Sequence, residues 1–382
     1  MHSTFLPIAL SLLLAPIPAG AEERKSAPTT TITLDENGLP MVSVTLHSLK
    51  NPNMTRTFRF ELDTGSGWCV VDQSVPSEFF WDENQIEANP RDVANQVVAS
   101  STVLLKRIEV GGLTRDGVIA SRMDLRNQIG RVQDHPMDGI LGMSFLRGTR
   151  FLIEPKENRI RWWGYHFSPG MTVPFTLGSG GVPWLTLRLG KLEAVAIVDT
   201  GMSGGVDLPP NLRPKGEGEA MVTAGASGKQ MAGSQMMVDR LDAGTGAWTH
   251  LPVTFQAEGS TGRIGTDVWL AAPVCFDFIT DNLTFSIDAE GNLPIRREPS
   301  RKLPLMWDRS GDIPHLVIVL VKPGSALEKA GCRVGDELIQ VGDLRGEAIT
   351  RRAAQDLVAS GVKHTWIVRR NGQSASLVFD AR

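Results

Sequence analysis

Two short stretches of this chain repeat one pattern, and together they limit what the chain can fold into. Residues 58–66 and 194–203 are each rich in apolar side chains and run into Asp-Thr-Gly, at Asp63 and at Asp199. Such a run before a glycine predicts a strand that leads into a tight turn. Because glycine lets another backbone approach closely, two facing turns of this kind would bring their carboxylates together.

The order of motifs up to residue 293 indicates an internal duplication. Each Asp-Thr-Gly turn is followed by an apolar segment with a central glycine, at residues 138–146 and 263–270. The two turns lie 136 positions apart (199 minus 63) and the two glycines 123 apart (265 minus 142), so the copies are trimmed unevenly. Short strand patterns dominate and helical periodicity is nearly absent. We therefore expect a mainly β protein with two lobes, residues 31–165 and 172–293.

The amino terminus has the features of a signal peptide. Residues 5–15 form an uncharged, mostly apolar run, and Ala19-Gly20-Ala21 supplies the small residues that signal peptidase requires. We expect residues 1–21 to be removed after Ala21 and the chain to be exported, to the periplasm or outside the cell. A buried first strand or helix is the alternative, because His2 is the only basic side chain before the run. No stretch is long enough to predict an integral membrane span.

Composition excludes several classes of function. The hydrophobic fraction of 41% and the charged fraction of 21% are typical of a soluble globular protein. A formal net charge of -3 gives no electrostatic footprint for nucleic acid. The seven histidines show no spacing typical of metal ligands, so we expect no metal and no other cofactor. No Gly-x-Ser-x-Gly motif supports a serine hydrolase.

Three cysteines are few for an exported chain, and their number is odd. Cys69 and Cys275 lie in different halves of the duplicated region. A disulfide between them and three buried thiols both remain possible readings of the sequence, since spacing alone does not determine connectivity.

A second type of organisation begins after the duplication. Residues 294–302 are charged and flanked by prolines, which is typical of a linker. Residues 303–382 then show a compact pattern of strands with two helices, the second beginning after Thr350. Asn371-Gly372 predicts the turn between the last two strands. We expect a small β-rich domain here.

The paired turns carry residues suited to acid–base chemistry. Two neighbouring carboxylates cannot both ionise, so they share one proton: one activates water and the other donates to a carbonyl oxygen. Asp63 and Asp199 are the expected catalytic pair, and no metal is needed. Around them we expect three kinds of support. The hydroxyls of Thr64 and Thr200 are expected to lock the turns, and Gly65 and Gly201 to allow their close approach. Ser66 and Ser203 are expected to bind the outer carboxylate oxygens.

These motifs resemble the two active-site turns of pepsin-like and retropepsin-like aspartic peptidases. The resemblance covers roughly residues 31–293 and implies a bilobal double β-barrel with an Asp63–Asp199 dyad. Two departures are visible: Met202 stands where threonine is usual, and Arg263 replaces an aliphatic residue and is expected to loosen the support of the second turn. The only tyrosine, Tyr165, lies outside the expected flap.

Flaps that close over the substrate are placed by position alone. The candidates are residues 95–101 and the second-lobe residues Gly225, Ala226, Ser227 and Gly228. Ordinary surface hairpins explain both segments equally well.

The last domain resembles the PDZ domains of exported bacterial proteases, through residues 322–326 and 330–339. Such domains bind an extended peptide by adding it to a sheet edge. The glycine-rich loop that captures a terminal carboxylate is not evident near residues 301–305, so binding of chain termini is not expected.

Taken together, these patterns predict an exported aspartic endopeptidase that acts on peptides or proteins and carries a PDZ domain for a second peptide or partner. Narrow specificity or self-processing would change only the substrate. The alternative from another class is an inactive scaffold of the same fold that binds extended peptides without cleaving them.

Overall fold

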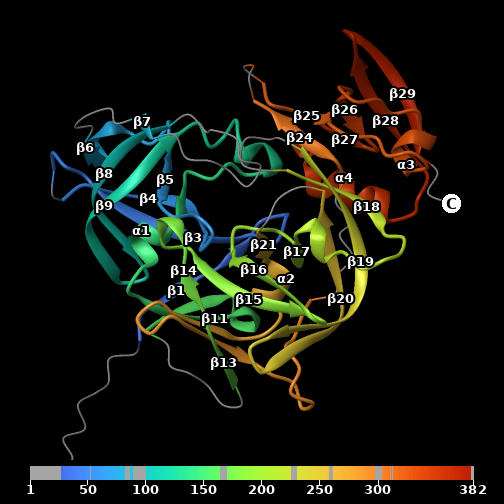
Figure 1. Cartoon of the computed structure of the whole chain (residues 1–382). Helices are drawn as coiled ribbons and strands as arrows, with labels where there is room; N and C mark the ends of the chain where they lie inside the picture. Colours follow the sequence, from blue (N-terminus) through green and yellow to red (C-terminus); the bar gives the residue numbers. More distant parts are fainter. Residues whose placement is uncertain are drawn as a thin grey trace, which may run out of the picture.

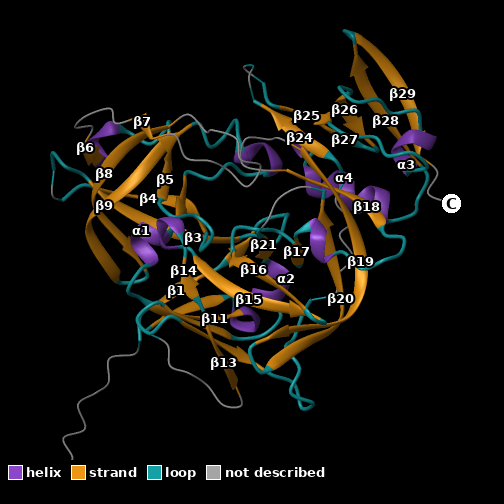
Figure 2. Cartoon of the chain, viewed as in Figure 1, coloured by secondary structure: helices purple, strands orange, loops and turns teal. Residues whose placement is uncertain are grey.

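The computed structural model describes residues 27–51, 53–81, 87–88, 100–163, 170–224, 230–257, 261–296, 303–309, 311 and 313–379. The fold is mainly β, as predicted, and the four α-helices of the described residues are short (Figure 2). They are α1 (Met143–Leu146), α2 (Thr266–Trp269), α3 (Ala326–Lys329) and α4 (Arg351–Ala359). The predicted signal peptide, both flap candidates except residues 100–101, and Tyr165 lie outside the described residues.

The first lobe is a closed barrel of six strands, because β3 pairs with β8 as well as with β4. In barrel order the strands are β3 (Pro40–His47), β4 (Thr55–Leu62), β10 (Gly139–Leu141), β5 (Cys69–Asp72), β9 (Leu113–Met123) and β8 (Ser100–Val110). Three short strands extend this sheet: β2 (Thr33–Leu34), β6 (Phe80–Trp81) and β7 (Glu87–Ala88). In β4, Phe58, Phe60 and Leu62 alternate toward the barrel core, as the period of two requires.

The second lobe repeats this barrel, and here β15 pairs with β19 to close it. Its strands are β15 (Pro183–Leu189), β16 (Leu192–Val198), β21 (Gly262–Ile264), β17 (Val206–Leu208), β20 (Gly246–Gln256) and β19 (Gln230–Ala243). Two strands extend it: β14 (Thr176–Leu177) and β18 (Glu219–Ala224). The two closed six-stranded barrels confirm the predicted double-barrel fold (Figure 1).

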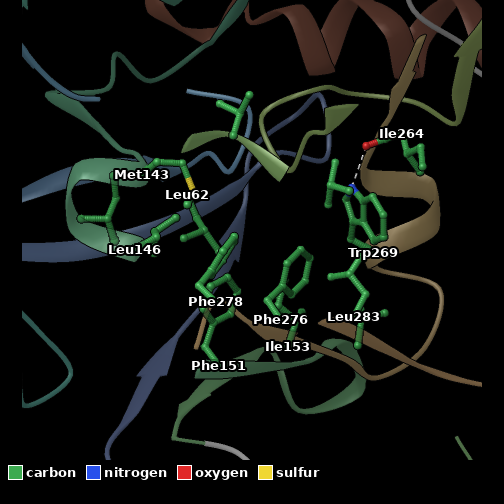
Figure 3. Packing of buried hydrophobic residues seen from close by; sticks show 14 of the residues in the cluster. Leu62, Met143, Leu146, Phe151, Ile153, Ile264, Trp269, Phe276, Phe278 and Leu283 are labelled. Atoms are coloured by element: carbon green, nitrogen blue, oxygen red, sulfur yellow. Dashed lines mark hydrogen bonds between the residues drawn. The ribbon is translucent and has the colours of Figure 1, made fainter. Parts of the chain in front are cut away.

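A third sheet joins the two lobes. Its order is β1 (Thr29–Thr31), β12 (Arg159–Trp162), β11 (Arg150–Glu154), β22 (Val274–Asp277), β23 (Asn282–Ser286) and β13 (Gly170–Pro174). The lobes meet where β11 pairs with β22, and the rings of Phe151 and Phe276 stack there with centroids 4.8 Å apart. One continuous apolar core therefore runs through both lobes (Figure 3).

The remaining strands and α3 and α4 form a separate body, which we call the C-terminal unit (residues 303–379; orange to red in Figure 1). Its strands are β24 (Leu305–Asp308), β25 (His315–Ile318), β26 (Glu337–Val341), β27 (Leu344–Arg345), β28 (His364–Arg370) and β29 (Gln373–Phe379). It has its own apolar core, in which Trp366 packs on Phe379 with ring centroids 4.2 Å apart. Asn371 and Gly372 take positive φ angles of 50° and 78°, so they form the predicted turn.

The three cysteines are buried, and no disulfide joins them in the described part of the chain. This agrees with the reading as buried thiols rather than a Cys69–Cys275 bridge. Among the described helices, none has the length and apolar character needed to cross a membrane.

Candidate active site

The two Asp-Thr-Gly turns start where β4 and β16 end, and each is supported from below by a parallel strand. β10 pairs with β4, and Leu141 O accepts a hydrogen bond from Asp63 N at 3.2 Å. In the second lobe β21 pairs with β16, and Ile264 O accepts from Asp199 N at 3.0 Å. The apolar segments expected to follow each turn therefore lie beneath it.

The glycine at the end of each supporting strand is required by space. A Cβ on Gly142 would lie 2.2 Å from Trp68 O, and one on Gly265 would lie 2.6 Å from Met202 O. Neither distance is possible between non-bonded atoms, so only glycine fits against the backbone of the turn.

Four hydrogen bonds between the two threonines and the opposite strands lock the turns together. Thr64 Oγ1 donates to Val198 O at 2.6 Å and accepts from Thr200 N at 3.1 Å. In the mirror arrangement, Thr200 Oγ1 donates to Leu62 O at 2.7 Å and accepts from Thr64 N at 3.0 Å. Both threonines are buried, so these bonds are shielded from water.

Close approach of the turns brings the carboxyl groups together. A Cβ on Gly65 would lie 2.6 Å from Cγ of Asp199, and one on Gly201 would lie 2.5 Å from Cγ of Asp63. Each carboxyl thus lies directly against the opposite turn, and the two side chains share a hydrogen bond. Backbone amides of the same turn also bind them: Gly65 N donates to Asp63 at 2.7 Å and Gly201 N to Asp199 at 3.0 Å.

The electrostatics of the pair are unequal. Burial and the neighbouring Asp199 charge hold the pKa of Asp63 well above its ordinary value. Burial also raises the pKa of Asp199, but the Arg263 guanidinium and the hydrogen bond from Asp63 oppose this rise. Both carboxyls therefore have a raised pKa, as expected for a pair that shares one proton, and Arg263 favours the ionised form of Asp199.

Arg263 does not loosen the second turn, contrary to expectation. β21 keeps its pairing with both β16 and β17, and Arg263 Nη2 donates to Asp207 Oδ2 at 2.7 Å. Gln256 Nε2 also lies 3.4 Å from that oxygen. The guanidinium is only 8% exposed, and the Asp207 carboxylate neutralises its charge. A buried ion pair therefore stands at the position where an aliphatic contact was expected.

The serine prediction is wrong for the Ser66 side chain. Its hydroxyl donates to Trp68 O at 2.8 Å, because that carbonyl is two residues away, and it is the backbone N of Ser66 that reaches Asp63, at 3.1 Å. Within the described residues, Ser203 makes no hydrogen bond with Asp199. The four flap candidates at 225–228 lie outside the described residues.

The sequence patterns missed two side chains next to the turns. Trp269 Nε1 donates to Ile264 O at 2.8 Å (Figure 3) and lies 3.3 Å from Asp199 O. Glu61 is 3% exposed, and its Oε2 has no hydrogen-bond partner in the described residues. The only sequence signal for Glu61 is a charged residue two residues before Asp63, on the face of β4 opposite to Phe60 and Leu62.

No group of three or more His, Cys, Asp or Glu side chains in the described part of the chain is arranged to hold a metal ion. Residues 24–145 match the family model described as aspartyl protease, and this stretch includes the first turn and its supporting strand. No curated protein matches the chain. The match and the double-barrel fold support an aspartic peptidase.

Proposed function

We propose that the chain is an aspartic endopeptidase whose catalytic dyad is Asp63 and Asp199. One observation carries the proposal: two buried threonines interlock the turns and hold each carboxyl against the opposite glycine. Two ionised carboxylates held this close would repel each other, so the pair shares one proton. General acid–base cleavage of a peptide bond requires such a shared proton.

In the proposed mechanism the ionised Asp199 accepts a proton from a water molecule as that water attacks the scissile carbonyl carbon. The protonated Asp63 donates its proton to the carbonyl oxygen in the same step, which gives a neutral gem-diol. Asp199 then gives its proton to the amide nitrogen while Asp63 takes a proton from one hydroxyl of the gem-diol, and the C–N bond breaks to give a carboxylic acid and an amine. This assignment of roles is supported by the Arg263 charge, which favours the ionised form of Asp199.

The test replaces each aspartate by asparagine, which keeps the shape of the side chain and removes the titrating group. Cleavage of an unfolded protein is followed across acid to neutral pH. We expect Asp63→Asn and Asp199→Asn each to lose at least about 10³-fold in kcat/KM, since either change destroys the shared-proton pair. A pepstatin-like transition-state mimic is expected to inhibit the wild-type chain.

Asp239→Asn is the matched control, because the Asp239 side chain is fully exposed on the second lobe. Its activity should equal that of the wild type. Retained cleavage in Asp63→Asn would refute the dyad. If the wild type cleaves nothing at any pH, the scaffold that binds peptides without cleaving them becomes the correct function.

The same proposal includes export and a PDZ-like role for the C-terminal unit. Export is supported by the apolar run and small residues before Glu22. The PDZ-like role is supported by the sheet of the unit, in which β24 is an edge strand and can receive an extended peptide. The protein for the cleavage test is therefore taken from the exported fraction, where its first residue should be Glu22.

A further inference from the structure

The segment that connects β9 to β10 in the first lobe (residues 124–138, the connector) lies against the C-terminal unit. It meets the unit along β24, an edge strand of the described sheet. Leu305 and Trp307 lie two residues apart on β24, so their carbonyls point to the same open edge. The connector reaches this edge through Arg131, whose Nε donates to Trp307 O at 3.0 Å.

The connector also places a carboxylate at the start of α4. Asp134 accepts hydrogen bonds from Arg351 N at 2.6 Å and from Arg352 N at 3.1 Å, and these are the first two residues of the helix. Trp307 Nε1 donates to the same carboxylate at 3.1 Å. A helix start favours negative charge and has free amide donors, so Asp134 satisfies the helix in the way that an anionic ligand does.

Two arginines of the unit bind the connector through its backbone. Arg309 donates to Gly130 O and, at 2.7 Å, to Gln133 O. Arg351 is buried at 4% exposure and donates to Val132 O from the connector and to Leu305 O of β24. Gly130 and Val132 belong to a 3-10 helix of the connector, Ile129–Val132, so these contacts recognise the backbone carbonyls of a tight turn rather than one side chain.

The contact is well buried on the first-lobe side as well. Arg351 Nη1 donates to Asn37 Oδ1 at 2.9 Å and lies 4.0 Å from Glu36 Oε1. Burial raises the pKa of Glu36 to about 6, and the charges of Asp35 and Asp134 add to that rise. The interface therefore excludes water from charged groups, which a loose surface contact would not do.

We propose that the connector is an internal ligand of the C-terminal unit, held on the β24 edge and the α4 start where an acidic peptide from another protein would otherwise bind. This rests on the peptide-binding role proposed above for the unit. An external partner is an acidic segment that takes the same turn and has an aspartate or glutamate that replaces Asp134 at the helix start.

The connector leads directly into β10, so the surface of the C-terminal unit that it occupies is connected through the chain to the Asp63 turn. The connector ends at Asp138, whose carboxylate accepts from Arg59 N on β4 at 2.9 Å, and the next residues form β10. β10 supplies the carbonyl that binds Asp63 N. The docked connector therefore supports the Asp63 turn, and its displacement lowers peptidase activity.

The binding test uses the full chain with Asp63→Asn, so that the probe is not cleaved. The probe is a fluorescent synthetic peptide of residues 124–138. The parent chain should exclude it, while a chain that also carries Asp134→Ala should bind it at least about tenfold more tightly, because the internal ligand has lost its helix contact. A probe with alanine at the position of Asp134 should bind that variant about tenfold more weakly than the unaltered probe.

Asp124→Ala is the control within the same connector, since the Asp124 carboxylate binds Asn127 and not the unit; this chain should behave as the parent. Equal binding by parent and Asp134→Ala, or no binding by either, overturns the proposal. If Asp134→Ala fails to fold by circular dichroism, Arg131→Gln replaces it, which removes the hydrogen bond to Trp307 O.

The activity arm uses chains with an intact dyad. Asp134→Ala should lower kcat/KM by roughly 2- to 30-fold, the usual range for coupling between sites, while Asp124→Ala should not change it. An unchanged rate for Asp134→Ala overturns the link to the Asp63 turn. If the wild type cleaves and the binding arm fails, only the internal-ligand proposal falls; if the wild type does not cleave, the binding arm still tests it.

Discussion

The two half-sites hold their aspartates in the same way, but the rows of side chains beside the two turns differ in polarity at three of four equivalent positions. Adjacent strands place four residues side by side next to each turn. In the first lobe they are Met41, Glu61, Ile140 and Val70. In the second lobe they are Trp184, Ile197, Arg263 and Asp207.

The segment that covers each row of side chains explains part of this difference in polarity. In the first lobe the connector contributes Leu125 and Met137 to an apolar cluster that includes Met41, Val70 and Ile140. In the second lobe the equivalent link between β20 and β21 is only residues 257–261. A short link supplies little apolar cover, so the ion pair of Arg263 and Asp207 provides the cohesion there. Duplication has kept the hydrogen bonds that fix each turn and has let their supports diverge.

The largest effect on stability is expected from the two threonines, whose hydrogen bonds are the same in both lobes. Thr64→Val leaves Val198 O and Thr200 N without partners, and Thr200→Val does the same to Leu62 O and Thr64 N. Each variant should lose roughly 2–6 kcal/mol of unfolding free energy in urea titrations, at about 1–3 kcal/mol per buried unpaired group.

The conservative controls are Thr64→Ser and Thr200→Ser, which keep the hydroxyl. They should retain most of the stability that the valine variants lose. A clear inequality between the two valine variants would show that the lobes also differ in their interlock.

A comparable effect is expected in the second lobe, where one partner of a buried ion pair can be removed. Arg263→Ile leaves Asp207 buried and unpaired and should cost about 3–5 kcal/mol of unfolding free energy. The double variant Arg263→Ile/Asp207→Val recreates the Ile140–Val70 pair of the first lobe and should recover most of that loss. If the double variant is as unstable as the single one, the ion pair is not interchangeable with the apolar pair.

The same double variant tests the influence of Arg263 on the dyad. Loss of the Arg263 charge raises the pKa of Asp199, and loss of the Asp207 charge lowers it by less, so the net change is a rise. Since Asp199 must be ionised to accept the proton of water, the acid limb of the pH–activity profile should move to higher pH. An unmoved acid limb would show that Arg263 has no influence on the dyad.

The smallest effect is expected from Glu61 in the first lobe, and it depends on pH. Burial, with Asp63, Asp35 and Asp199 adding to it, holds the pKa of Glu61 well above its ordinary value of 4.5. Below pH 4.5 the carboxyl is protonated in both the folded and the unfolded chain and contributes no pH dependence. As pH rises above 4.5 the unfolded chain ionises first, so folding stability falls.

Glu61→Gln removes this titration. The stability of the wild type relative to this variant should fall by up to about 1.4 kcal/mol per pH unit above pH 4.5, measured by urea unfolding at several pH values. Asp124→Asn, an equivalent change away from the row, should show no such trend. A constant difference between wild type and Glu61→Gln from pH 4 to 7 would mean that Glu61 ionises normally.

Much of this architecture was predictable from the sequence, because it depends on patterns among residues that are close together in the chain. The two-lobed, mainly β duplication follows from repeated short strands, the double barrel from the resemblance to aspartic peptidases, and each Asp-Thr-Gly turn from a few adjacent residues. The partners of Arg263 were not predictable, because Asp207 lies 56 positions away and only the register of β17 against β21 brings the two together. The Ser66 hydroxyl was assigned to the wrong acceptor for a related reason: sequence does not show the rotamer that selects Trp68 O.

By itself, then, the sequence determined the duplicated β fold and the two turns, since strand alternation and turn chemistry act between near neighbours. Only the tertiary structure decided which backbone groups the two threonines bind, how the Arg263 charge is neutralised, and where the connector meets α4. Those features depend on burial and on contacts between residues far apart in the chain, such as Asp134 and Arg351, and no local pattern encodes them.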